Sequence, residues 1–190
     1  MNNTKDTIIT ELTSTNRPGM PLLIEHMRVN GFFAAPCSGG NHMCQEGGLA
    51  EHSLNVYRTA LKLNETLNAN IPIESIIICS LLHDLGKMGD YGKANYVPNM
   101  LKSGKQSETK PYETNSELLY IDHEIRSVEI AREYIQLTEQ ENFAILMHNG
   151  LYGSFKYEIP GKETPLYLIL HTADMWASRV IEVSNDSKEK

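Results

Sequence analysis

One apolar stretch constrains the fold of this chain more than any other segment. Residues 76–82 read Ile-Ile-Ile-Cys-Ser-Leu-Leu, and they are followed by His83-Asp84-Leu85-Gly86-Lys87. This pattern predicts a buried helix that ends at Gly86, with Lys87 just beyond it. Adjacent residues are about 100° apart around a helix, so His83 and Asp84 can both approach one metal ion beyond its end. An isolated His-Asp pair is usually a coincidence, so the rest of the chain decides what this pair means.

Length and composition indicate a single globular domain over residues 1–190. The net charge is −7, and 41% of the residues are hydrophobic, as in ordinary globular proteins. No apolar run reaches the length of a transmembrane helix, so we expect no membrane partner. The acidic charge argues against a broad surface for duplex nucleic acid. It does not exclude a phosphorylated substrate, because a bound metal ion would reverse the local field.

The cysteines and the N-terminus favour a reduced, cytoplasmic location. Cys37, Cys44 and Cys79 cannot all pair, and the first residues contain no apolar signal segment. Cys37, His42 and Cys44 lie in a loop rich in small residues, but one histidine between two cysteines does not match a structural zinc pattern. We therefore expect no zinc site in this loop. Nothing in the sequence indicates an oligomeric state.

Helical periodicity and capping residues predict an all-α fold. Thr138 and Glu141 match a capping box, and Thr164-Pro165 matches an N-cap followed by proline in the first turn. The irregular segments 88–121 and 149–162 are each expected to contain a small β-hairpin, and the first is interpreted as a lid-like insertion. The helices are predicted at 6–14, 21–29, 49–67, 72–86, 122–131, 138–148 and 164–182.

Histidines and aspartates recur on the predicted helices, at separations of 25–39 residues. Such wide separation is typical of a site inside a helical bundle, where each helix contributes one or two inward side chains. Imidazole and carboxylate ligands together suit Mn, Fe, Co, Ni or Zn. The candidates, in chain order, are His52, His83, Asp84, His123, His148 and Asp174.

This ordered set, centred on His83-Asp84-Leu85-Gly86-Lys87, resembles the HD superfamily of metal-dependent phosphohydrolases. The run Gly-Gly-Leu-Ala-Glu-His-Ser at residues 47–53 is similar to the HD domain of certain bacterial 3′–5′ exoribonucleases. No Gly-Tyr-Pro follows the third-histidine region, so the cyclic-di-GMP branch is not supported. The resemblance covers residues 47–182 and implies an HD-type helical bundle, preceded by N-terminal helices and a loop over residues 1–46.

The added His123 and His148 resemble the branch of the superfamily that binds two metals. Asp84 would then bridge the two ions, and His123 and His148 would complete the second. In the alternative, these two histidines surround a single metal without binding it directly. The resemblance implies that the first ion is bound by His52, His83, Asp84 and Asp174.

Further side chains near these ligands are candidates for catalysis and substrate binding. Asp84 and Lys87 are the predicted catalytic residues, and Lys87 and Arg126 are predicted to bind the substrate phosphate. Alternatively, Lys87 complements the helix dipole and Arg126 forms a surface salt bridge. His171 lies three residues before Asp174 on the same helix face, and it is expected to support the site.

The predicted function is hydrolysis of a nucleotide, or of a short phosphodiester or phosphomonoester, by a metal-activated water. The expected partner is a small phosphorylated molecule, with a short single-stranded oligonucleotide as another candidate. Two other hypotheses remain open: a non-catalytic HD module that senses a nucleotide, and a di-iron oxygenase built on the same bundle. The substrate itself is not predicted.

Overall fold

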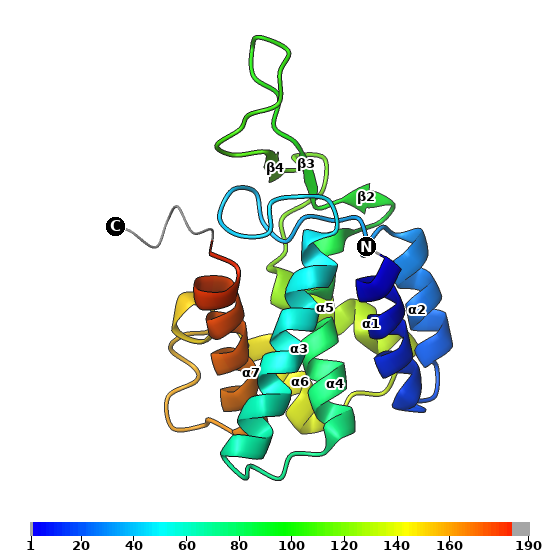
Figure 1. The fold of residues 1–190 in the computed structure, drawn as a ribbon, viewed down its shortest axis with the longest axis vertical. Helices are drawn as coiled ribbons and strands as arrows, with labels where there is room; N and C mark the ends of the chain where they lie inside the picture. The colour runs from blue at the N-terminus through cyan, green and yellow to red at the C-terminus, as the bar shows by residue number, and fades with distance from the viewer. Residues whose placement is uncertain (1, 184–190) are drawn as a thin grey trace.

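The computed structural model describes residues 2–183, and it confirms the all-α fold. Figure 1 shows the helices packed as a bundle, with a long loop and hairpins projecting from one end. Short 3-10 turns at Leu85–Met88 and Gly150–Tyr152 and a π-helical turn at Ala177–Ile181 complete the helical structure. The α-helices are α1 (Asn2–Ser14), α2 (Met20–Val29), α3 (Gly48–Thr66), α4 (Ile73–Leu82), α5 (His123–Tyr134), α6 (Glu139–Met147) and α7 (Pro165–Trp176).

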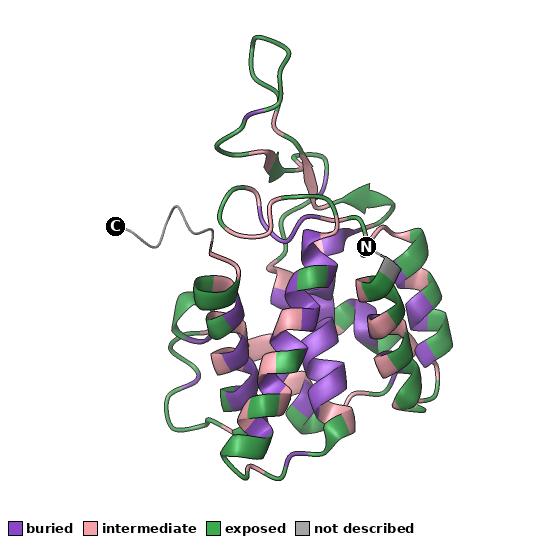
Figure 2. Ribbon diagram, in the orientation of Figure 1, coloured by how far each residue is buried: buried purple, intermediate pink, exposed green. Residues whose placement is uncertain are grey.

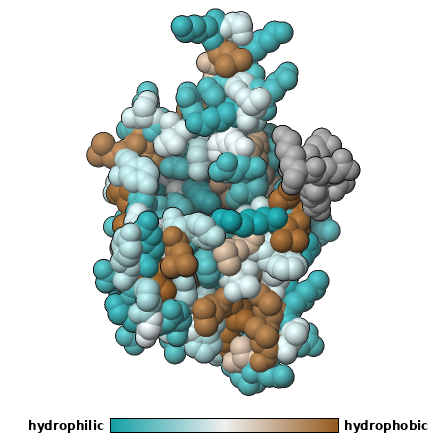
Figure 3. Space-filling view, turned by 90° about the vertical axis from the view of Figure 1, so that its left-hand side faces the viewer, coloured by the Kyte–Doolittle hydropathy of each residue, from teal (hydrophilic) through white to brown (hydrophobic). Residues whose placement is uncertain are grey.

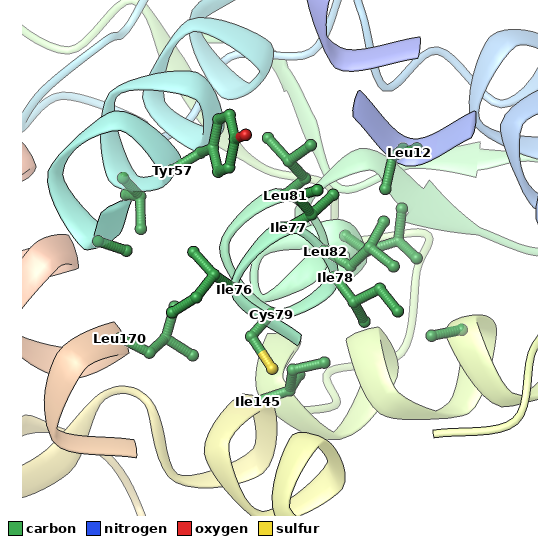
Figure 4. Close-up of a cluster of buried hydrophobic side chains, with 14 of the residues drawn as sticks. Leu12, Tyr57, Ile76, Ile77, Ile78, Cys79, Leu81, Leu82, Ile145 and Leu170 are labelled. Carbon is green, nitrogen blue, oxygen red and sulfur yellow. The ribbon is translucent and has the colours of Figure 1, made fainter. Parts of the chain in front are cut away.

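Helix α4 lies at the centre of the bundle because it is apolar on every side. It packs against α1, α3, α6 and α7, and Figure 2 shows it buried over most of its length. In Figure 4, Ile76 lies toward Leu170 of α7 and Cys79 toward Ile145 of α6. Each such side chain contributes about 1.5–3 kcal/mol when fully buried, so the helix is held firmly. No helix within residues 2–183 is long and apolar enough to cross a membrane.

The predicted starts of α5, α6 and α7 agree with the structure, whereas α1 begins at Asn2 and not at residue 6. Thr138 and Glu141 form the expected capping box, and the Thr164 hydroxyl accepts a hydrogen bond from the Tyr167 backbone N–H. Asp122 stands at the N-cap of α5 as predicted, but its carboxylate does not cap the helix. It instead accepts a hydrogen bond from the Tyr120 hydroxyl.

The predicted end of the central helix was wrong. Helix α4 ends at Leu82, His83 is its C-cap, and Gly86 lies inside the following 3-10 turn. A Cβ atom on Gly86 would lie 2.5 Å from the His123 carbonyl oxygen and 2.9 Å from the Arg126 Cβ. Glycine is therefore required at this position for close packing against α5, and not as a left-handed helix cap.

Residues 88–121 contain two small hairpins, where the sequence predicted one. β1 (Gly89–Asp90) pairs antiparallel with β2 (Lys93–Ala94), and β3 (Tyr96–Pro98) pairs antiparallel with β4 (Tyr112–Thr114). The second hairpin also contacts the loop that precedes α3, through a hydrogen bond from the Tyr112 N–H to the Gly39 carbonyl.

The predicted hairpin at 149–162 was wrong, because no strand forms in this segment of the described chain. Its backbone N–H and carbonyl groups bond to residues close by in the sequence, so few of them remain to pair two strands. Successive turns are closed by N–H to carbonyl bonds from Tyr152 to Asn149, Gly153 to Gly150, Lys156 to Gly153, Glu158 to Phe155 and Lys162 to Ile159.

Candidate metal centre

The six histidines and aspartates selected from the sequence gather at one end of the bundle. The first turns of α3 carry His52, and the junction after α4 carries His83 and Asp84. The side chains of His52, His83, Asp84 and His148 are at most 1% exposed. The side chains of His123 and Asp174 are 26% and 17% exposed, so the cluster opens toward solvent on their side. His123 begins α5, His148 caps α6, and Asp174 lies in the last turn of α7.

Asp84 is the centre of the cluster, and its two carboxylate oxygens face different histidines. Its Oδ2 lies 3.4 Å from the Nε2 atom of His52 and 3.4 Å from that of His83. Its Oδ1 lies 3.2 Å from the Nε2 atom of His123 and 3.5 Å from that of His148. Asp174 adds a second carboxylate, 3.2 Å from the His52 Nε2.

Each histidine is oriented through its other ring nitrogen, Nδ1. His83 Nδ1 donates to the Ser80 carbonyl at 2.9 Å, and His148 Nδ1 donates to the Ile145 carbonyl at 2.7 Å. The remaining two rings face carboxylates, His52 at 3.0 Å from Glu182 and His123 at 3.3 Å from Glu124. Partners of this kind fix the Nδ1–H tautomer and leave Nε2 free to bind a metal.

The residues fit a divalent metal on observations independent of the sequence pattern. His52, His83 and Asp174 each offer a ligand atom within 4.8 Å of the other two. The same is true of His83, Asp84 and His148. The buried Oδ1 of Asp84 has no hydrogen-bond partner among the described residues. The Nε2 atoms of His52 and His83 are 3.3 Å apart, and two such lone pairs repel unless a proton or a cation lies between them. The Nε2 atom of His123 is less free to bind a metal, because the Asn149 amide contacts it at 3.2 Å.

The charges of the cluster keep both aspartates ionised. Burial opposes ionisation of Asp84, but Lys87 and His83 hold the pKa of its carboxyl well below the usual range. Burial likewise opposes ionisation of Asp174, whose pKa is lowered by its hydrogen bond with His52. Two carboxylates among imidazoles form a strongly attractive environment for a small divalent cation.

A cleft of about 380 Å³ leads from this cluster to the surface. Lys87 lies at its inner end, with Nζ 2.7 Å from the Asp84 Oδ2. At the rim, the Arg179 guanidinium lies 4.4 Å above the ring of Tyr152. Figure 3 shows that the face on the α7 side is hollowed below the projecting hairpin and is largely hydrophilic around the hollow. The cleft is lined by Asn41, His42, Lys87, Asn149, Tyr152, His171, Asp174, Met175, Ser178 and Arg179.

Two further predicted residues lie near the cluster but not in its centre. His171 lines the cleft and donates from Nδ1 to the His148 carbonyl at 2.7 Å, so it braces the end of α6. Arg126 is only 2% exposed, and its Nη2 donates to the Leu119 carbonyl at 3.0 Å. It is not among the residues that line the cleft, and its role in substrate binding stays a prediction.

Sequence reasoning missed Glu124 and Asn149 beside His123, and it also missed three residues on the His52 side of the cluster. Glu182 follows the π-helical turn after α7, and its fully buried carboxylate contacts His52 at 3.0 Å and His42 at 2.6 Å. Cys37 is fully buried, with its sulfur 3.9 Å from the Asp84 Oδ2. Cys37 and His42 were noticed only as parts of a zinc pattern, and no local spacing connects Glu182 with a histidine 130 residues earlier in the chain.

Comparison with known proteins gives one match. A family model described as the HD domain matches residues 49–175, which is more than half of the chain. No curated protein and no solved structure matches the chain significantly. The matched range begins just before His52 and ends just after Asp174, so it contains all six residues of the cluster.

Proposed function

Because the chain belongs to the HD-domain family of metal-dependent phosphohydrolases, we propose that it hydrolyses a nucleotide or another small phosphate ester. The bond that is cleaved would be a phosphomonoester or a short phosphodiester. The proposal includes two bound metal ions that share Asp84, with metals of the Mn, Fe, Co, Ni or Zn type.

One observation carries this proposal. Four histidines direct Nε2 toward Asp84, two toward each carboxylate oxygen, while each Nδ1 is held on the opposite side. A carboxylate can accept hydrogen bonds at about four lone-pair sites, but an imidazole that carries its proton on Nδ1 presents a lone pair at Nε2, which suits a cation and not a carboxylate. Ligands that are oriented and buried before the metal binds are what a catalytic metal site requires of its scaffold.

His52, His83, Asp84 and Asp174 would hold the first ion, and Asp84, His123 and His148 the second. When bound, such ions activate a water molecule as a nucleophile and offset the charge on the phosphoryl oxygens. The buried scaffold around Asp84 keeps the ligand positions fixed, which avoids reorganisation during the reaction.

Lys87 is suited to bind a substrate phosphate at the inner end of the cleft. Its side chain is 14% exposed, and its ammonium group already lies beside the cluster. Burial opposes the charge, but the Asp84 carboxylate keeps the pKa of Lys87 well above its usual range. The group therefore stays cationic at neutral pH and can form a charge-assisted hydrogen bond to a phosphoryl oxygen.

The cleft favours a small substrate over a long oligonucleotide. Its volume of about 380 Å³ is near the lower end for ligand pockets, which hold molecules in about the 300–1,000 Å³ range. Arg179 and the Tyr152 ring at the rim offer a cation and an aromatic surface to the part of the substrate farthest from the metals.

The proposal is tested with protein loaded with Mn²⁺ or Co²⁺ and a panel of nucleoside mono-, di- and triphosphates, dinucleotides and simple phosphate esters. Asp84→Asn should lose metal and reduce turnover by at least about a hundredfold. Lys87→Met should retain its metal but raise KM for the phosphate ester. Asp6→Asn is the matched control, because Asp6 is an exposed carboxylate on α1 far along the chain from the cluster.

Three outcomes would contradict the proposal. The first is that metal-loaded protein hydrolyses no member of the panel and Asp84→Asn retains all its metal. This result would show that Asp84 does not bind the metal. Tight binding of a nucleotide without any turnover would indicate a sensor. Uptake of oxygen by an iron-loaded sample in the presence of substrate would indicate an oxygenase.

A further inference from the structure

The loop over residues 36–47 covers the metal centre and carries a buried thiol. Cys37, near its start, is fully buried, and its backbone N–H donates to the Met43 carbonyl at 3.0 Å. A Cβ atom on Gly39 would lie 2.7 Å from the Tyr112 carbonyl oxygen, so the loop is packed tightly beneath the second hairpin. The thiol is therefore held in place by the backbone around it.

The surroundings of the Cys37 sulfur are polar. It lies 3.9 Å from the Asp84 Oδ2 and 3.8 Å from the Lys87 Nζ. Its sulfur and one ring nitrogen from each of His42 and His52 lie within 4.8 Å of one another. The same Oδ2 atom faces the Nε2 atoms of His52 and His83. Cys37 therefore lies close to the Asp84 Oδ2 atom, which His52 and His83 also face.

The distances satisfy a simple geometric test for ligands of one ion. Typical bond lengths are about 2.3 Å from zinc to sulfur and about 2.1 Å from zinc to oxygen, so two such ligands lie at most about 4.4 Å apart. The 3.9 Å between the Cys37 sulfur and the Asp84 Oδ2 is within this limit. A cysteine that only filled space would need no carboxylate and no ammonium group beside it.

We propose that Cys37 is a ligand of the metal ion bound on the Oδ2 side of Asp84, together with His52 and His83. This inference rests on the metal centre of the proposed function and adds a sulfur ligand to it. Ligation forms a metal–sulfur bond in place of the S–H bond, and the proton passes to solvent. The ammonium group of Lys87 offsets the negative charge of the thiolate.

A sulfur ligand restricts the metal that this half of the site prefers. Thiolates favour zinc, iron and cobalt over magnesium and manganese, which prefer oxygen. The half of the cluster around His123 and His148 has no cysteine among the described residues near it, so its preference is broader. The two halves would then differ in metal affinity, and the half that contains Cys37 would retain its ion longer against a chelator.

The test uses optical spectra of the 190-residue chain loaded with Co²⁺, because bound Co²⁺ shows a near-ultraviolet charge-transfer band when sulfur is one of its ligands. Wild type is expected to show this band, and Cys37→Ser is expected to lose it while it still binds cobalt. Competition with a chelator should show at least a tenfold loss of cobalt affinity in Cys37→Ser. Cys44→Ser is the matched control and should behave as wild type, because the Cys44 thiol bonds to Ser38 and the His42 carbonyl instead.

Two results would overturn the inference: cobalt bound to wild type without a charge-transfer band, or a band that persists in Cys37→Ser. Wild type that binds no cobalt at all would instead contradict the metal centre itself, so the two failures are distinguishable. If Cys37→Ser does not fold, the chemical shift of ¹¹³Cd bound to wild type decides the question. A resonance in the range of sulfur-ligated cadmium supports the inference, and one typical of nitrogen and oxygen ligands overturns it.

Discussion

Gly86→Ala provides a sharp test of how the metal ligands are held by the fold. Gly86 lies two residues after Asp84, at the point where the 3-10 turn presses against α5. A Cβ atom there would lie 2.5 Å from the His123 carbonyl oxygen and 3.0 Å from the Ser127 backbone nitrogen. The Gly86 N–H also donates to the Ser127 hydroxyl at 2.8 Å, so the two segments have little freedom to separate.

The expected cost follows from these contacts. Overpacking a rigid interior costs about 1–3 kcal/mol, and the closest clashes here involve backbone atoms, which places the cost in the upper half of that range. Replacing glycine also reduces the entropy of the unfolded chain, which returns about 0.4–1 kcal/mol. The net loss in the free energy of unfolding is therefore about 2 kcal/mol. With a urea m-value of about 2 kcal/mol/M, the midpoint should fall by about 1 M.

Urea unfolding followed by circular dichroism in the presence of EDTA measures this change without any contribution from bound metal. Gly40→Ala is the control, because Gly40 is exposed and a Cβ atom there would lie 3.2 Å from the Lys110 side chain and no closer than 3.4 Å to any backbone atom of Thr109 or Lys110. Its midpoint should remain within about 0.3 M of wild type. A Gly86→Ala midpoint equal to that of Gly40→Ala would refute the close-packing argument.

Three other substitutions give further tests. Glu182→Gln weakens the partner of the His52 Nδ1 and should lower metal affinity by about 10–100-fold, measured by competition with a chelator. Glu141→Gln removes the buried partner of Arg17 and should cost about 3 kcal/mol at pH 7. Burial opposes ionisation of Glu141, but the hydrogen bond from Arg17 lowers the pKa of its carboxyl below 4.5. The stability that this ion pair contributes is therefore present above pH 4.5, and it is lost as the pH falls through the pKa of the folded state. Urea titrations at several pH values should therefore show wild type and Glu141→Gln converging in acid. Arg179→Ala should raise KM for the substrate by about tenfold with little change in kcat, measured by steady-state kinetics.

Much of the fold was predictable from the sequence because local signals carry it. The apolar run at 76–82 specifies a central helix, and capping residues such as Thr138 and Thr164 define helix starts within the first turn. The histidines and aspartates of the cluster were also identifiable, because each belongs to an ordered pattern that spans the chain.

What the sequence did not reveal depends on tertiary contacts. Gly86 has the position of a helix cap, and only the approach of α5 shows that it is needed for packing. The segment 149–162 has the composition of a hairpin, but its backbone bonds close successive local turns. Glu182 reaches His52 only because a π-helical turn extends α7, and no spacing in the sequence reports such a contact.

In the sequence, the second hairpin lies between the first three residues of the metal centre and the last three. A tight turn at its exposed tip is closed by a hydrogen bond from the Gly104 N–H to the Leu101 carbonyl. Proteolytic nicking at this tip would produce two fragments, and neither would contain a complete set of ligands. The ion would then join two polypeptides, in addition to the packing of α4 before the tip against α6 and α7 after it, so the nicked pair should dissociate at a lower urea concentration once a chelator has removed the metal. The fragment before the tip carries His52, His83 and Asp84, and the fragment after it carries His123, His148 and Asp174.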